Sequence, residues 1–412
     1  MDGHSLPSVE ILKCALPKLQ KPILFRNMLR NSDGSYEWKL LNWSFSDLIE
    51  KFGDKQLPFR VGDYNKCTHT LQHHRQRTSP PTKLCKLTLQ EFFIATGGMT
   101  KEGYDKWLYC DYKHMMEFSD KPEIIESFNW LKFGFDKEFG KNGLYSTIWI
   151  GSKGAHTDCH WDTYGYNLVA QIHGRKLWLL YPPSDSLIPV RIPYEESTVY
   201  SKIDIYCLSM EERELLLKIP DKPKLIILEP GDVLFVPNGW WHYVESLDNI
   251  TVSVNVWGKL KTDNRARVKE ALVKLIVGKM RKKNYKQFKN KIEYVVTECI
   301  KEEEKEKNKK IELPQETPLK KFKPTIWTAE DLAEQYPNYI EMLHDAEEHE
   351  FKEFIEERLK RNKEKYSADE KTTSEDDISN PHYDSCLESV INALCHPDVI
   401  SKAAQVLLER HY

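Results

Sequence analysis

Short apolar runs rich in β-branched and aromatic residues recur between residues 144 and 257, and turn sequences separate them. The runs expected to form strands are 146–150, 168–172, 176–181, 225–228, 233–236 and 250–257. Turns are expected at His173-Gly174, Pro182-Pro183, Pro230-Gly231 and Asn238-Gly239. Because these strands follow one another without long helices between them, the pattern favours a sandwich or barrel. We expect a jelly roll, that is, a double-stranded β-helix core.

The chain before residue 144 carries the start and stop signals of short helices. Ser44 or Ser46 can cap a helix that Gly53 ends. Thr88 and Glu91 have the spacing of a capping box ahead of an apolar segment. The fold class is therefore mainly β with α, and the N-terminal helices precede the core.

The tail after residue 258 has the pattern of charged helices. One apolar stripe consists of Val268, Leu272, Leu275 and Ile276, and a second of Ile340, Leu343, Phe351, Phe354, Ile355 and Leu359. A last helix is expected to begin near Pro397. We divide the chain into a globular unit at 15–258 with its core at 144–257, a charged helical region at 259–362, a polar linker at 363–380 and a helical segment at 381–412.

Composition limits the class of protein. Of 412 residues 40% are hydrophobic and 11% aromatic, which excludes a wholly disordered chain. The net charge of −3 gives no overall case for nucleic-acid binding. The basic stretch 259–291 is the one feature that favours RNA, and a solvated helix face is the preferred explanation of that stretch. No apolar run is long enough to cross a membrane, and the first residues lack the pattern of a secretory signal. Nine cysteines without a C-x-x-C pair fit reduced thiols in the cytoplasm or nucleus.

His160 and Asp162 form the most informative local pattern. Residues two apart on a strand point to the same face, so this pair can hold one metal ion. Non-haem Fe(II) oxygenases add a second histidine to such a pair, and His242, directly after two tryptophans in the β-rich part, can supply it. The same H-x-D spacing at His156 and Asp158 leaves a shifted register open.

Four motifs together resemble one known family. They are H-W-D at 160–162, N-L-V-A-Q-I-H-G-R-K at 167–176, G-D-V-L-F-V-P-x-x-W-W-H at 231–242 and N-V-W at 255–257. They are similar to the JmjC family of cupin-fold 2-oxoglutarate oxygenases, and most similar to the branch with the asparaginyl hydroxylase that inhibits hypoxia-inducible factor. Residues 22–62 resemble the N-terminal portion of that branch. The whole chain also resembles a family member that associates with a small heat-shock protein.

The resemblance implies a complete set of site residues. It implies Fe(II) ligands at His160, Asp162 and His242, and it thereby decides against the shifted register. It implies 2-oxoglutarate contacts from Lys176 to the distal carboxylate and from Thr157 and Tyr109 through hydroxyl groups. It further places Asn167 and Asn255 near the metal and cosubstrate, and Trp257 in the pocket wall.

The resemblance also implies an activity, in which O2 and 2-oxoglutarate are consumed, succinate and CO2 are formed and a substrate is hydroxylated. Asp162 stands where many demethylases of the family have Glu, which favours a hydroxylase of a protein side chain. We expect such an enzyme, which also binds a small heat-shock protein and acts in cellular stress response. The alternatives are an adaptor with little or no catalysis and a tRNA-modifying hydroxylase. The tail stripes could also join two subunits, and since all proposed ligands precede residue 258, the metal site is expected not to need the tail.

Overall fold

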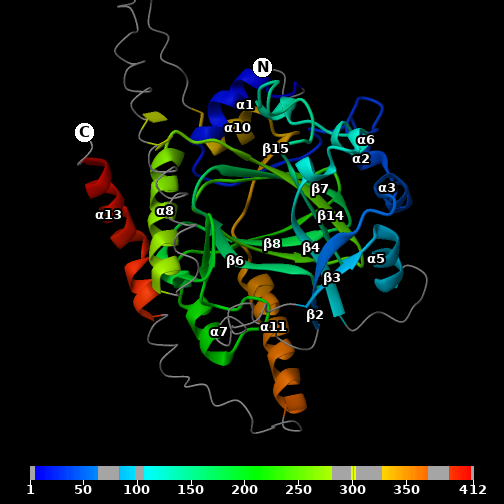
Figure 1. The fold of residues 1–412 in the computed structure, drawn as a ribbon. Helices are drawn as coiled ribbons and strands as arrows, with labels where there is room; N and C mark the ends of the chain where they lie inside the picture. Colours follow the sequence, from blue (N-terminus) through cyan, green and yellow to red (C-terminus); the bar gives the residue numbers. More distant parts are fainter. Residues whose placement is uncertain are drawn as a thin grey trace, which may run out of the picture.

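The fold is built on two antiparallel sheets that face each other, with helices around them (Figure 1). The computed structural model describes residues 5–63, 83–97, 106–280, 298–299, 301–302, 327–369 and 389–409. In the larger sheet the order of strands is β15-β1-β12-β7-β14-β5-β4-β2-β3, and in the smaller sheet it is β11-β8-β13-β6-β10-β9. This arrangement confirms the predicted jelly-roll core with helices.

The strands follow the predicted apolar runs closely. The larger sheet contains β1 (Ile23–Phe25), β2 (Leu57–Asp63), β3 (Lys83–Leu87), β4 (Lys106–His114), β5 (Thr147–Gly151), β7 (Tyr166–His173), β12 (Val233–Val236), β14 (Thr251–Gly258) and β15 (Ile340–Met342). The smaller sheet contains β6 (His156–Asp162), β8 (Lys176–Tyr181), β9 (Pro189–Glu195), β10 (Thr198–Ser201), β11 (Lys224–Leu228) and β13 (Trp241–Ser246). All six predicted strands are present within two residues of their expected bounds.

The helices lie outside the sheets. They are α1 (Val9–Ala15), α2 (Lys39–Asn42), α3 (Phe45–Phe52), α5 (Leu89–Ala95), α6 (Pro122–Ile125), α7 (Met210–Leu217), α8 (Asp263–Met280), α10 (Ala329–Gln335), α11 (Glu348–Asp369) and α13 (Pro397–Glu409). Ser44 and Thr88 cap α3 and α5 with reciprocal capping boxes, as the sequence predicts, and Gly53 ends α3. Helix α13 begins at Pro397, the predicted residue.

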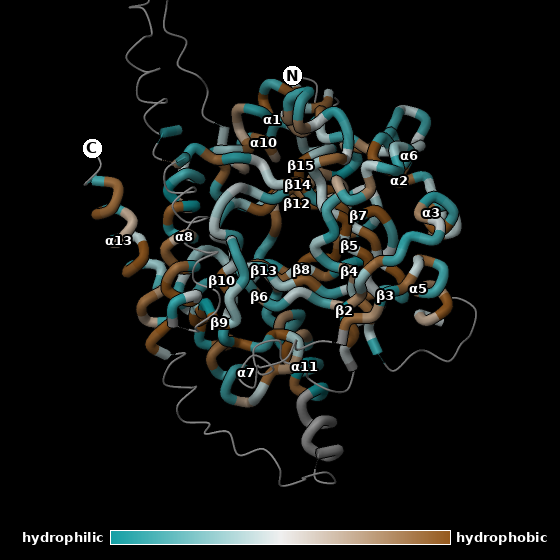
Figure 2. Tube along the Cα trace, in the orientation of Figure 1, coloured by the Kyte–Doolittle hydropathy of each residue, from teal (hydrophilic) through white to brown (hydrophobic). Residues whose placement is uncertain are grey.

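Three apolar clusters hold these layers together. The first packs the outer face of the larger sheet against the N-terminal helices and α10, for example through Phe59 and Phe92. The second lies between the outer face of the smaller sheet and the helices α7 and α11. The third fills part of the space between the two sheets and includes Val169 and Trp178. In Figure 2 hydrophobic residues are accordingly concentrated in the central strands, while the surrounding helices alternate between hydrophobic and hydrophilic residues.

The tail differs from the sequence interpretation at Ile340. We expected this residue and Leu343 on a helical stripe, but Ile340–Met342 is the strand β15, which pairs with β1 at the edge of the larger sheet. Leu343 follows that strand and precedes α11, so it is not helical either. The run is too short for its period to reveal a strand, and pairing with a distant strand decides its conformation. The division at residue 258 stays a prediction, while Leu332 of α10 and Ile340 pack into the first cluster with residues of the N-terminal half.

Two further expectations concern the tail and the thiols. The predicted linker 363–380 begins inside α11, which extends to Asp369, and its residues after 369 lie outside the described part of the chain. Six described cysteines are free thiols, but Cys207 is disulfide-bonded, so the expectation of reduced thiols fails there. Within the described residues, no helix has both the length and the apolar character needed to cross a membrane.

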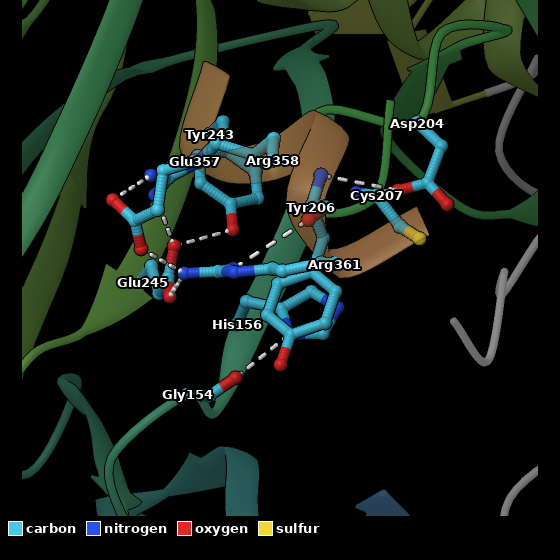
Figure 3. A network of polar contacts seen from close by, with 10 residues as sticks. All are labelled: Gly154, His156, Asp204, Tyr206, Cys207, Tyr243, Glu245, Glu357, Arg358 and Arg361. Carbon is cyan, nitrogen blue, oxygen red and sulfur yellow. Dashed lines mark hydrogen bonds and ion pairs between the residues drawn. The ribbon is translucent and has the colours of Figure 1, made fainter. Parts of the chain in front are cut away.

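Helix α11 packs on the outer face of the smaller sheet through a buried ionic network (Figure 3). The carboxylate of Glu245 on β13 accepts hydrogen bonds from Arg358 at 2.5 Å, from Arg361 at 2.8 Å and from the Tyr243 hydroxyl at 2.9 Å. Burial raises the pKa of Glu245, but the two arginines outweigh this effect and hold it below its usual value. The tail thus supplies both cations that neutralise a buried carboxylate of the core.

Candidate metal centre

Strand β6 has an irregularity that decides which of its side chains face the space between the sheets. Its register against β13 pairs His160 with His242 but Thr157 with Val244, so β6 has one extra residue between Thr157 and His160. Such a β-bulge interrupts the alternation of faces. Thr157 and His160, which strict alternation would place on opposite faces, therefore line the same cavity.

Three potential metal ligands converge at this cavity. His160 and His242 lie opposite each other on β6 and β13, with their ring centroids 4.2 Å apart. The Oδ1 atom of Asp162 lies 3.9 Å from Nε2 of His160. One ligand atom from each of the three residues lies within 4.8 Å of the other two. Two imidazoles and one carboxylate on one side of a cavity suit a divalent metal with open positions on its other side.

The backbone orients both imidazoles for this role. Nδ1 of His160 lies 2.7 Å from the carbonyl oxygen of Asp158, and Nδ1 of His242 lies 3.0 Å from that of Trp240. A histidine that donates its Nδ1 hydrogen to a carbonyl keeps the Nε2 lone pair for a metal. Both rings are thus fixed in the tautomer that a metal ligand requires.

The charge states at the site also suit a cation. Desolvation, with a contribution from His242, holds the pKa of His160 well below its usual value, so its ring is neutral. Burial raises the pKa of Asp162, and the Trp257 indole, which donates to Oδ2 of Asp162 at 2.9 Å, opposes this effect. A buried carboxylate beside two imidazoles is stabilised when a metal ion lies among them. The donor set therefore fits Fe(II).

A buried lysine lines the same cavity. The Nζ atom of Lys176 donates to the Ser253 hydroxyl at 2.9 Å and lies 5.3 Å from the centre of the Tyr109 ring. Among the described residues, no carboxylate lies within ion-pair distance of this atom, and desolvation lowers its pKa to about 7. Since a buried ammonium is costly without an anion, the position fits the carboxylate of a ligand. The hydroxyls of Tyr109 and Thr157, 3.3 Å apart, add polar partners in the same cavity.

Two asparagines that bond to each other also line this cavity. Nδ2 of Asn255 donates to Oδ1 of Asn167 at 2.9 Å, and Oδ1 of Asn255 accepts from the Trp149 indole at 2.8 Å. All the predicted site residues thus line one cavity: Tyr109, Thr157, His160, Asp162, Asn167, Lys176, His242, Asn255 and Trp257. Their proximity agrees with the sequence interpretation, while their roles remain proposals.

The sequence interpretation missed several residues of the cavity. Ser253 could have been found, because it alternates with Asn255 and Trp257 on β14 and therefore shares their face. Tyr112 could not, because it sits at a register irregularity of β4 and has a φ of 49°, in the left-handed region.

The shifted register, with His156 and Asp158 as ligands, has little support in the structure. The His156 ring stacks on Tyr206 at 3.9 Å between centroids, and its Nδ1 lies 2.9 Å from the Gly154 carbonyl oxygen. Its Nε2 lies 3.7 Å from Asp158, but in the described part of the chain no third ligand joins them. The bulge in β6 places His156 on the outer face, beside Tyr243.

A jelly roll with two histidines, one aspartate and a buried lysine in the same cavity defines a cupin-type protein with a candidate metal centre. Residues 12–264 match the family described as "Cupin-like domain", and the chain belongs to this family. The comparisons with related proteins confirm the predicted JmjC-type membership.

Several relatives share this part of the chain. HSPB1-associated protein 1 of Bos taurus is 40% identical over 279 residues, which cover 65% of this chain and 53% of that protein. The 2-oxoglutarate and iron-dependent oxygenase JMJD4 of Danio rerio is 32% identical over 138 residues, covering 33% of this chain and 31% of that protein. The lysine-specific demethylase JMJ31 of Arabidopsis thaliana is 34% identical over 112 residues, covering 27% and 20%. The chain thus spans about half the length of the HSPB1-associated proteins that it matches.

Proposed function

We propose that this protein is an Fe(II)- and 2-oxoglutarate-dependent hydroxylase that acts on a protein side chain. The observation that carries the proposal is the cavity in which His160, Asp162 and His242 converge and which Lys176 also lines. A metal-binding cupin without this cosubstrate gains nothing from a buried, unpaired lysine there, since the lysine destabilises the fold. The relatives named as an oxygenase and a demethylase support the same chemistry.

Each group of this chain would have a defined task. His160, Asp162 and His242 would hold the metal, and Lys176, Tyr109 and Thr157 the distal carboxylate of 2-oxoglutarate. When bound, iron and 2-oxoglutarate would supply the oxidising chemistry: 2-oxoglutarate and O2 give succinate and CO2, with one oxygen atom of O2 going to succinate and the other to a C–H bond of the substrate. The Trp257 indole would keep Asp162 oriented through its hydrogen bond to Oδ2.

The test is an anaerobic titration of the chain with Fe(II) and 2-oxoglutarate. Chelation of the metal by the keto acid gives a visible charge-transfer band, so the test needs no knowledge of the substrate. The band, together with succinate formation on admission of O2, is the expected result. A folded chain that takes up iron but develops no band would contradict the proposal.

Replacement of Lys176 by alanine is expected to weaken 2-oxoglutarate binding and to leave iron binding unchanged. A hydrogen bond between a charged lysine and a carboxylate contributes about 1.5–3 kcal/mol, so the dissociation constant should rise by about one to two decades. The titration above measures it. Lys176→Arg should restore only part of the affinity, since the guanidinium is larger and planar. Normal 2-oxoglutarate binding by Lys176→Ala would exclude the lysine from the cosubstrate site.

We also expect the affinity for 2-oxoglutarate to fall as the pH rises through neutrality. Burial lowers the pKa of Lys176 to about 7, and the protonated form is the one that binds a carboxylate. Above that pH a growing fraction of Lys176 is neutral, so the dissociation constant should rise, approaching about tenfold per pH unit. The arginine variant keeps its charge and should show no such dependence, which separates the lysine from other titrating groups.

We further propose that the chain binds a small heat-shock protein. The name of the HSPB1-associated relatives supports this, and the match covers about half their length. If partner binding and catalysis are separate, the double substitution His160→Ala with Asp162→Ala should leave co-precipitation with purified HSPB1 unchanged. Loss of binding would mean that the partner approaches the metal site itself.

A further inference from the structure

The guanidinium of Arg60 lies next to the residues that carry two hydroxyls of the metal cavity. Arg60 is on β2 of the larger sheet, directly opposite Tyr109 on β4. Its side chain is only 19% exposed, and its Nε atom lies 2.6 Å from Oδ2 of Asp111, which is also on β4. Arg60 is not among the described residues that line the cavity. It can therefore influence a ligand there only through the residues that it contacts.

This guanidinium contacts both Tyr109 and the backbone next to Thr157. Its Cζ atom lies 5.5 Å from the centre of the Tyr109 ring, which is within the range of a cation–π interaction. Its Nη2 atom donates to the carbonyl oxygen of His156 at 3.3 Å, and that carbonyl belongs to the peptide bond leading to Thr157. A single cation on the larger sheet thus contacts the ring that carries one hydroxyl and the strand that carries the other.

The spacing between these two hydroxyls depends on side chains. Tyr109 is on β4 of the larger sheet and Thr157 is on β6 of the smaller sheet, so no backbone ladder joins the two strands. Their hydroxyl oxygens are nevertheless 3.3 Å apart. Burial raises the pKa of Tyr109, so its hydroxyl keeps the hydrogen that it can donate to a carboxylate. A contact that bridges β4 and β6 at this point fixes how the two donors are placed.

The contacts of residue 60 require an arginine. The guanidinium is planar and donates in several fixed directions, so it can pair with Asp111 through Nε while Nη2 reaches the His156 carbonyl oxygen. A lysine could neutralise Asp111, but its single ammonium group could not make both contacts. If residue 60 only had to balance the charge of Asp111, either cation would be sufficient. This difference separates a positioning role from a purely ionic one.

We propose that Arg60 is a positioning residue of the 2-oxoglutarate site, which holds the hydroxyls of Tyr109 and Thr157 so that both can donate to the same carboxylate. The inference rests on the proposed function, because it concerns the cosubstrate of that metal centre. It extends the site to a residue of β2 that neither ligates the metal nor lines the cavity.

The experiment is the anaerobic titration of the intact, Fe(II)-loaded chain with 2-oxoglutarate, followed through the charge-transfer band. Arg60→Lys keeps the positive charge beside Asp111 and should unfold at nearly the same temperature as the native chain. The dissociation constant of 2-oxoglutarate should nevertheless rise about three- to tenfold, as for the loss of about one hydrogen bond, while iron content stays the same. Arg60→Met, which also removes the charge, should weaken binding at least as much.

The matched control is Arg175→Met. It removes the same charge, from a half-exposed ion pair with Asp248 beside Lys176 in the sequence, and should leave the dissociation constant unchanged. A second comparison introduces Arg60→Lys into a chain that carries Tyr109→Phe and Thr157→Val. Because both hydroxyls are absent there, Arg60→Lys should change the dissociation constant less than twofold.

The possible outcomes separate this inference from the proposed function. Native 2-oxoglutarate affinity in folded Arg60→Lys would overturn the positioning role alone. The same would follow from an undiminished effect of Arg60→Lys in the chain without the two hydroxyls, because Arg60 would then act by another route. A native chain that binds iron but develops no charge-transfer band would overturn the proposed function, and the positioning role with it.

Discussion

Replacement of His242 by alanine is expected to abolish stable Fe(II) binding while the protein remains folded. The remaining ligands, His160 and Asp162, lie two residues apart on β6 and approach the metal from one side only. Loss of one of three protein ligands at such an open site should lower the affinity by several decades, because the chelating arrangement is lost. Metal content after anaerobic loading and desalting is the measurement.

The matched control for this substitution is His156→Ala. His156 lies on β6 as well, but on the outer face against Tyr206, so iron content should persist. Circular dichroism shows whether each variant is folded. Full iron occupancy in folded His242→Ala would refute the ligand assignment, and iron loss confined to His156→Ala would favour the shifted register.

The substitution Arg358→Met is expected to lower the free energy of unfolding strongly, because it breaks the ion pair between α11 and Glu245 of the smaller sheet. Arg358 and Glu245 have side chains that are only 2% and 4% exposed, and Arg361 is the other arginine that contacts this carboxylate (Figure 3). Breaking a buried ion pair from one side typically costs about 3–5 kcal/mol, because the remaining charge stays buried. This is a large part of a typical total stability of about 5–15 kcal/mol. Urea unfolding measures the loss.

Two variants test the origin of this loss. Arg213→Met removes a more exposed ion pair between Arg213 of α7 and Glu356 of α11. This loss should lower the stability by about 0–1 kcal/mol. Adding Glu245→Gln to Arg358→Met removes the buried charge that Arg361 alone would then neutralise, and should recover part of the stability. If Arg358→Met were as stable as Arg213→Met, α11 would not be held through this network.

The same network revises the expectation that the metal site does not need the tail. A chain that ends after Gly258 loses both arginines and also the buried Phe354, Ile355 and Leu359 of α11. Burial of these three side chains alone contributes roughly 5–9 kcal/mol. We therefore expect the truncated chain not to fold, although every proposed ligand precedes the cut.

The strands of the core and most of the residues that line the cavity could be predicted from the sequence. Short apolar runs bounded by turn sequences are local signals, so the bounds of β8 and β12 could be predicted directly. Two features of the sequence indicate the candidate site: side chains of the types that bind a metal or a carboxylate, and the family resemblance. They single out His160, Asp162, His242 and Lys176. Ser253 could also have been predicted, because it lies two residues before Asn255 on β14 and therefore shares its face.

The tertiary structure alone decided how these elements meet. The bulge that turns Thr157 to the inner face of β6 and His156 to the outer face is visible only against the partner strand β13. The strand at Ile340 exists because β1 offers an unpaired edge. Likewise, the pairing of Glu245 with α11 joins residues more than a hundred positions apart. These features arise from contacts between distant segments, and the local pattern of a sequence does not record which segments will meet.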